Sequence, residues 1–163
     1  MRDWVVASGI IEGPGGILLV ENLRRDGRTD WSPPGGVVEV HEGESVLDGL
    51  TREVAEETGI TVTQWEGPVW TVEAEAPGMG WRMKVEVHRA VAFEGEVVVA
   101  DPDGIVIGAA FVDLAECADR LAPTGRHVHE PLAAWLLERW EGSQAFSYLV
   151  EGTDRATMSI TRR

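Results

Sequence analysis

Three glutamates within five residues are the most chemically informative feature of this sequence. Glu53, Glu56 and Glu57 lie in the segment 52–60, which reads REVAEETGI. An α-helix rotates about 100° per residue, so it places these carboxylates within roughly 100° of arc. Like charges at this spacing oppose helix formation, and a coordinated cation would remove that opposition. Because Mg²⁺ and Mn²⁺ prefer oxygen ligands, the pattern predicts a metal site.

The elements around these carboxylates are also readable from the sequence. Ser45 is suited to cap the helix start, Gly59 is suited to end it, and an adjoining face carries an apolar stripe of Leu47, Leu50, Val54 and Thr58. Upstream, Pro33-Pro34 restricts the backbone before Gly35-Gly36, where a close approach is allowed. A backbone carbonyl there can serve as a ligand for a hard metal ion. Gly49 lies one turn before Glu53, so the glycine loop has room to approach.

Residues 36–60 resemble the signature of Nudix hydrolases, G-x5-E-x7-R-E-U-x-E-E-x-G-U, in which U is a bulky aliphatic residue. From Glu44 onward the match is complete, but seven residues instead of five separate Gly36 from Glu44. Counting from Gly36 would select Glu42 as the first glutamate of the signature, and counting from Arg52 selects Glu44. Helical spacing is stiffer than loop spacing, so Glu44 is preferred.

The resemblance implies roles for these residues. Glu56 and Glu57 would bind metal, Glu53 would be a ligand or a base, and the Gly35 carbonyl would be a further ligand. Glu44 and Arg52 would support the site through a charge contact that orients the ligands. The implied catalytic set is therefore Glu44, Arg52, Glu53, Glu56 and Glu57.

The implied activity is hydrolysis of a pyrophosphate bond in a nucleoside diphosphate linked to another moiety. Water would attack phosphorus at a Mg²⁺-carboxylate site, with Mn²⁺ as an alternative cation. A downstream carboxylate often completes such sites, and spacing does not choose among Glu94, Glu96, Asp101 and Asp103. Arg24 and Arg25 are candidates for phosphate contacts, and Trp81, which follows a glycine turn, for stacking on a nucleobase.

Two other functions share the fold. One is a catalytically silent nucleotide-binding regulator, but this sequence keeps every carboxylate of the signature. The other is isopentenyl-diphosphate isomerase, which uses a cysteine and a glutamate. The only cysteine, Cys117, falls in a predicted helix well after the signature, which disfavours the isomerase.

The pattern of apolar and turn-forming residues along the rest of the sequence predicts one α/β domain over residues 1–163. Strands are expected at 4–11, 17–20, 37–40, 62–65, 69–76, 81–93, 105–112, 146–150 and 157–160, and helices at 114–121 and 131–140. The first two strands would form a hairpin, Pro131 would open the last helix, and 105–112 would be buried. The resemblance adds an α/β/α sandwich around a mixed β-sheet.

Composition excludes several classes of partner. A net charge of −14 argues against general binding to nucleic acids or anionic membranes. A small nucleotide or other diphosphate substrate remains compatible if metal ions offset the acidic charge. A single cysteine forms no internal disulfide, and no apolar run approaches the roughly 20 residues of a membrane span. These features predict a cytoplasmic protein, and the resemblance leaves room for a homodimer.

Overall fold

The computed structural model describes all 163 residues and contains two β-sheets and three α-helices. The large sheet has the strand order β10-β9-β6-β7-β1-β5, and the small sheet has the order β2-β3-β4 with β8 paired to β3. The strands are β1 (Arg2–Ile10), β2 (Glu12–Gly13), β3 (Gly16–Leu23), β4 (Thr29–Ser32), β5 (Gly35–Val37), β6 (Thr61–Ala76), β7 (Trp81–Glu94), β8 (Val106–Val112), β9 (Gln144–Glu151) and β10 (Ser159–Arg162).

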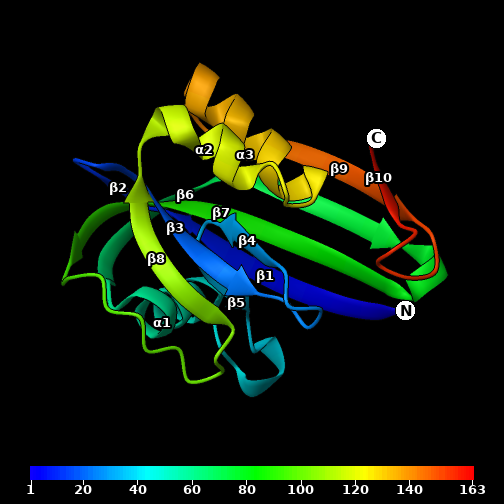
Figure 1. The fold of residues 1–163 in the computed structure, drawn as a ribbon, viewed down its shortest axis with the longest axis horizontal. Helices are drawn as coiled ribbons and strands as arrows, with labels where there is room; N and C mark the ends of the chain where they lie inside the picture. The colour runs from blue at the N-terminus through cyan, green and yellow to red at the C-terminus, as the bar shows by residue number, and fades with distance from the viewer.

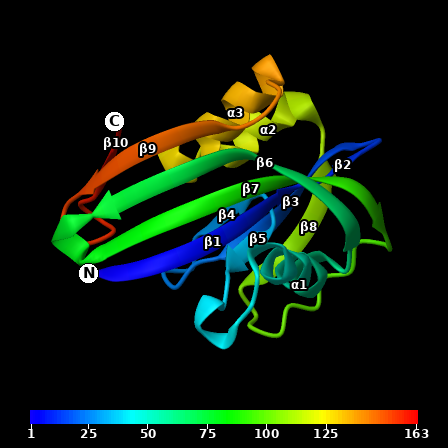
Figure 2. The ribbon, with the colours of Figure 1, turned by 180° about the vertical axis from the view of Figure 1, so that it is seen from behind.

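The helices cover the two sides of the large sheet. They are α1 (Val46–Thr58), α2 (Leu114–Leu121) and α3 (Arg126–Glu138), and short 3₁₀ helices span Val40–Glu42 and Pro77–Met79. Helix α1 contacts β1, β5 and β6, whereas α3 contacts β6, β9 and β10 and packs beside α2 (Figures 1 and 2). This is the predicted α/β/α sandwich around a mixed sheet. None of the helices combines the length and hydropathy that a membrane span requires.

Two hydrophobic clusters hold these layers together. The cluster on the α1 side includes Leu50 and Val54, both completely buried, and it also contains Ala7, Ile11 and Leu18. Burying one such aliphatic side chain contributes about 1.5–3 kcal/mol. The predicted apolar stripe is therefore confirmed at Leu50, Val54 and the buried Thr58, but Leu47 is 40% exposed. The second cluster joins β6, β7 and β9 to α2 and α3.

The predicted hairpin between the first two strands is confirmed only next to its turn, where the Leu18 N–H donates to the Ile11 carbonyl. Strand β1 pairs with β5 and β7 in the large sheet, while β3 pairs with β2, β4 and β8 in the small sheet. The turn around Gly13 to Gly16 is real, but it joins the two-residue strand β2 to β3. Side-chain alternation identified two strands correctly and contained no information about which sheet each one enters.

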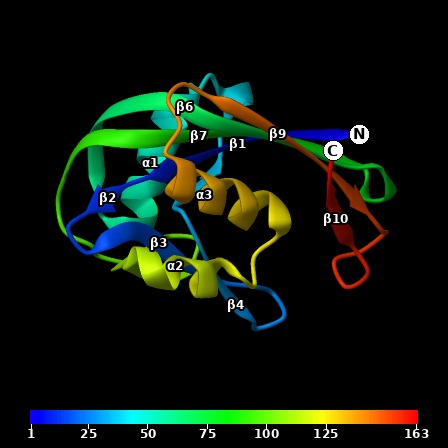
Figure 3. The same ribbon diagram turned by 90° about the horizontal axis from the view of Figure 1, so that it is seen from above.

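Other elements differ from the prediction in extent or burial, among them the strand predicted at 37–40, where β5 ends at Val37 and a 3₁₀ helix spans Val40–Glu42. Strand β6 runs unbroken through Gly67-Pro68, where its register with β7 shifts. Helix α3 begins at Arg126, so Pro131 lies inside it. Strand β8 is predicted to be buried, but Ile107 is 47% exposed while its neighbour Val106 is 4% exposed, so only one face of the strand is buried at this point. Strand β10 lies at the end of the molecule opposite to α1 (Figure 3).

Candidate functional site

Helix α1 is held in position at both of its ends. The Ser45 hydroxyl accepts a hydrogen bond of 3.1 Å from the Asp48 N–H, as expected for an N-cap. Gly59 adopts a left-handed conformation with φ 77°, and its N–H donates to the Ala55 carbonyl. A Cβ at Gly59 would lie 2.9 Å from the Glu96 carbonyl oxygen. This glycine therefore also lets the segment before β8 pass close to the helix end that carries the three glutamates.

The glycine loop and the glutamates meet at strand β5. Gly35 and Gly36 pair with Ser8 and Ala7 of β1. The Gly35 N–H donates a 2.8 Å hydrogen bond to Oε1 of Glu57. A Cβ at Gly36 would lie 2.6 Å from the carboxyl carbon of Glu53, so only glycine fits without displacing that carboxylate.

Glu57 and Glu53 are carboxylates in a strongly perturbed environment. Glu57 is only 8% exposed, and burial raises its pKa to about 8, with further contributions from the negative charges of Glu53, Asp101 and Glu56. The Gly35 N–H opposes this shift. Burial also raises the pKa of Glu53, against the neighbouring Arg52 charge. Such a pair is costly to ionise alone and well suited to a nearby cation.

Arg52 forms a two-point ion pair with Glu44. Its Nε lies 2.8 Å from Oε2 and its Nη2 lies 3.0 Å from Oε1 of Glu44. This guanidinium, together with the Glu39 N–H, lowers the pKa of Glu44 to about 2. A Cβ at Gly49 would lie 2.8 Å from Glu44 Oε1, which explains the glycine within the helix. The structure thus places Glu44, and not Glu42, against Arg52.

The same arginine reaches the glutamates of the signature. Its Nη1 lies 3.1 Å from Oε1 of Glu53 and 3.3 Å from Oε2 of Glu56. In this arrangement no group of three or more His, Cys, Asp or Glu side chains is placed to hold a metal ion. The chemistry of the donors still fits a hard divalent cation, because Glu53 and Glu57 are shielded oxygen donors whose ionisation needs a positive charge nearby.

The structure distinguishes the four downstream carboxylates. Asp101 uses Oδ2 to accept the N–H groups of Ile105 and Val106, at 3.0 and 2.9 Å, and Oδ1 to accept that of Asp103, so it orders the turn before β8. Asp103 is exposed, and its charge contributes to the raised pKa of Glu53. Glu94 and Glu96 are exposed and make no such contribution.

The three predicted substrate-binding residues have different surroundings, and only Trp81 is placed far from the glycine loop by strand register. Arg24 is held by Asp30 through two contacts of 2.7 Å, an interaction that the sequence analysis did not anticipate. Arg25 is exposed just beyond β3. Trp81 pairs with Arg2, whereas Gly35 pairs with Ser8 on the same strand β1. Six residues of strand separate these positions, or roughly 20 Å.

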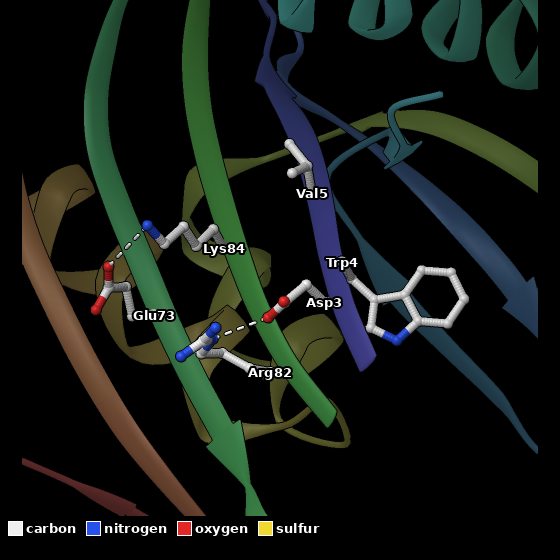
Figure 4. A pocket seen from close by; sticks show the side chains of 6 residues that line it. All are labelled: Asp3, Trp4, Val5, Glu73, Arg82 and Lys84. Carbon is white, nitrogen blue, oxygen red and sulfur yellow. Dashed lines mark hydrogen bonds and ion pairs between the residues drawn. The ribbon is translucent and has the colours of Figure 1, made fainter. Parts of the chain in front are cut away.

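A surface hollow of about 430 Å³ lies on the open face of the large sheet and is separate from this site. Its side chains come from β1, β6 and β7, as Figure 4 shows. Arg82 pairs with Asp3 at 2.9 Å and Lys84 pairs with Glu73 at 3.7 Å. Its charges thus already pair with one another, and it contains none of the signature residues.

Comparison with protein families agrees with this geometry. The NUDIX domain model matches residues 2–136, which covers most of the chain and the whole of the carboxylate cluster. The protein belongs to the Nudix family. Its membership makes it a Nudix-type hydrolase acting on pyrophosphate bonds, and such enzymes generally use divalent metals and small nucleotide-type substrates. No protein with a curated functional description is significantly similar in sequence.

Solved structures share the fold. The MutT NUDIX hydrolase from Burkholderia pseudomallei is 28% identical, with a TM-score of 0.60 over 71% of this chain and 86% of that one. The ORF135 protein of E. coli is 25% identical, with a TM-score of 0.68 over 85% of this chain and 94% of that one. The MutT protein from Methanosarcina mazei Go1 is 21% identical, with a TM-score of 0.67 over 86% of this chain and 97% of that one. At this level of identity the similarity supports the fold alone.

Proposed function

We propose that this Nudix protein is a divalent-metal-dependent hydrolase that cleaves the pyrophosphate bond of a nucleoside diphosphate linked to another moiety. The proposal rests on one observation. Glu57 and Glu53, two carboxylates shielded from water, lie against the Gly35-Gly36 backbone beside the Arg52–Glu44 ion pair. This arrangement concentrates oxygen donors where water and a phosphoryl group can meet.

The residues that would hold the cation are Glu53, Glu56, Glu57 and the Gly35 carbonyl. A bound Mg²⁺ or Mn²⁺ ion polarises phosphoryl oxygens and lowers the pKa of water. Glu57 is fixed by the Gly35 N–H, and Gly36 leaves room for the carboxylate of Glu53. The two-point contact to Glu44 fixes the orientation of Arg52 and therefore the charge next to Glu53 and Glu56.

Proton transfer requires an acceptor near the attacking water. Glu53 either binds the cation or accepts this proton, and burial moves its pKa toward the range in which a general base works well. We assign the completing carboxylate to Asp103, because its side chain is free while both oxygens of Asp101 accept backbone N–H groups. Asp101 then acts by ordering the turn that presents Asp103.

The isomerase alternative lacks its cysteine at this site. Cys117 is 1% exposed in the cluster between α2 and the large sheet, where its Sγ donates to the Val112 carbonyl at 3.7 Å. It belongs to a different hydrophobic cluster from the one that packs beneath α1. Proton transfer on a carbon skeleton through Cys117 therefore has no structural basis.

The test is a substrate panel assayed with Mg²⁺ and with Mn²⁺. It should contain dinucleoside polyphosphates, ADP-ribose, nucleotide sugars and damaged nucleoside triphosphates, with release of phosphate or nucleoside monophosphate as the readout. We expect at least one compound to be cleaved, and Glu57→Gln to abolish cleavage while its circular dichroism spectrum is unchanged. Glu116→Gln, on the exposed face of α2, is the matched control. Nucleotide binding without turnover of any compound would instead identify the silent regulator.

A further inference from the structure

Arg52 is the only basic side chain that forms an ion pair with the glutamates of the signature. Its Nη1 lies within 3.3 Å of both Glu53 and Glu56, and no other Lys, Arg or His approaches Glu53, Glu56 or Glu57 within ion-pair distance. In the protein without metal, the positive charge that two of these carboxylates require is therefore supplied from within the helix.

The rest of the guanidinium is anchored elsewhere. Nε and Nη2 both bond to Glu44, whose Oε1 also accepts the Glu39 N–H at 2.9 Å. A guanidinium is planar and rigid, so this two-point contact also fixes the position of Nη1. Nη1 cannot withdraw from Glu53 and Glu56 while the contact to Glu44 persists. If these charges separate, it is therefore the carboxylates of Glu53 and Glu56 that move, while the guanidinium stays in place.

We propose that Arg52 holds the carboxylates of Glu53 and Glu56 in an inactive position, and that both leave Nη1 when a divalent cation binds. This inference rests on the metal site of the proposed function. A divalent cation repels the guanidinium and attracts the carboxylates more strongly than a single positive charge does. Arg52 is thus a positioning residue that acts through two ligands.

The number of contacts indicates which bonds break, because Glu44 has two contacts with the guanidinium, whereas Glu53 and Glu56 have one each. The contacts from Nη1 measure 3.1 and 3.3 Å, whereas those to Glu44 measure 2.8 and 3.0 Å. Glu56 and Arg52 are each about one third exposed, and ion pairs with that exposure are weak. Glu53 is 18% exposed, and its only contact with the guanidinium is the one from Nη1. Glu44 is 16% exposed and is bonded at both oxygens. The ion pair with Glu44 therefore persists while the Nη1 contacts are exchanged for the cation.

The experiment is NMR of the arginine side chains in ¹⁵N-labelled protein, with EDTA and then with saturating Mg²⁺. In EDTA, slow rotation about the Cζ–Nη bonds should give distinct Arg52 Nη resonances. Mg²⁺ should shift and broaden the Nη1 resonance, while the Nε–H resonance, bonded to Glu44, should move little. Arg52→Lys assigns the signals. Arg24, held by Asp30 through a similar two-point contact, is the matched control and should not respond.

Thermal unfolding of the same samples separates the two proposals. If Mg²⁺ raises the Tm of the wild type but not of Glu57→Gln, the cation occupies the proposed site. An unchanged Nη1 resonance under those conditions would overturn the displacement of Glu53 and Glu56 and leave the metal site standing. If Mg²⁺ fails to raise the Tm of the wild type, the metal site of the proposed function fails, and this inference fails with it.

Discussion

The backbone N–H of Gly35 donates to Oε1 of Glu57 across 2.8 Å, which ties the edge strand β5 to the last turn of α1. The bond links a loop whose length departs from the Nudix signature to a helix that matches it completely. Between these fixed points Val40–Glu42 forms a 3₁₀ turn that Gly43 ends. The contact between the loop and the helix therefore spans this turn.

Replacing Gly36 with alanine should disrupt the site. The new Cβ would lie 2.6 Å from the Glu53 carboxyl carbon, so this carboxylate must move. We expect at least a tenfold loss of kcat/KM and a destabilisation of about 1–3 kcal/mol, typical of overpacking. Gly15→Ala, whose Cβ meets no atom closer than 3.5 Å, is the control. Full activity in Gly36→Ala would contradict the placement of Glu53.

Glu44→Gln and Glu42→Gln should behave differently. Glu44 accepts hydrogen bonds from Nε and Nη2 of Arg52 and from the Glu39 N–H, whereas Glu42 is exposed and contacts neither residue. Loss of a residue that orients ligands typically costs about 10- to 100-fold in activity or metal affinity. Because Arg52 is partly exposed, the change in stability should be only about 1 kcal/mol. Steady-state kinetics of both variants with Mg²⁺ tests this difference. Equal losses of activity in the two variants would refute the assignment of Glu44 as the partner of Arg52.

Metal-free protein should lose stability as the pH rises from about 4.5 to 8. The pKa of Glu57 is raised from 4.5 to about 8. Between these values the unfolded chain has released the proton while the folded protein retains it, so rising pH favours unfolding. The loss should be on the order of a few kcal/mol. Urea unfolding in EDTA measures it. Glu57→Gln should flatten this slope, and a slope that is unchanged in the variant would exclude Glu57 as its source.

His127 should produce the opposite dependence at lower pH. Its Nδ1 is buried without a hydrogen-bond partner, and burial, together with the nearby His129, lowers its pKa below 6.5. As the pH falls through 6.5, the unfolded chain takes up a proton before the folded protein does, so stability falls. In His127→Gln this acid-side loss should be smaller. His129→Gln should retain most of it, and equal pH profiles for the wild type and His127→Gln would refute the prediction.

Replacing the two aspartates before β8 should have different effects: the change at Asp101 should lower stability, and the change at Asp103 should lower activity. Asp101→Ala removes the acceptor for three backbone N–H groups and should lower stability by about 1–3 kcal/mol. Asp103→Ala removes an exposed carboxylate beside Glu53 and should leave the Tm nearly unchanged while reducing kcat about a hundredfold or more. Thermal unfolding and kinetics on the same preparations test both. Unimpaired kcat in Asp103→Ala would exclude it from the reaction.

Local spacing predicted the helix well because its determinants are local. Ser45, Gly59 and the Leu50–Val54 stripe lie within one helical segment, and each is where the pattern indicates. The choice between Glu42 and Glu44 also followed from helical stiffness. By contrast, the pairing of β1 with β7 joins residues about 80 positions apart, such as Asp3 and Arg82. The alternation of apolar and polar residues along one strand does not identify a partner strand so far away in the sequence.

The site itself was only partly predictable for the same reason. The signature named the carboxylates, but the constraint on Arg24 comes from Asp30 on the opposite strand of a hairpin. The distance of Trp81 from Gly35 depends on two separate strand registers. The turn sequence Asp101-Pro102-Asp103-Gly104 gave one usable signal, since its first aspartate is the residue that bonds to the backbone.

Strands β9 and β10 follow residue 136, where the match to the family model ends. Nevertheless, Phe146, Tyr148 and Val150 of β9 belong to the hydrophobic cluster that includes Trp70 and Val72 of β6. A shortened protein ending at residue 136 would leave the edge of β6 from Trp70 to Glu75 unpaired and the apolar side chains of this part of β6 in contact with water. Such a fragment should associate with itself or with other chains. The smallest unit that folds cleanly is therefore longer than the segment that defines the family.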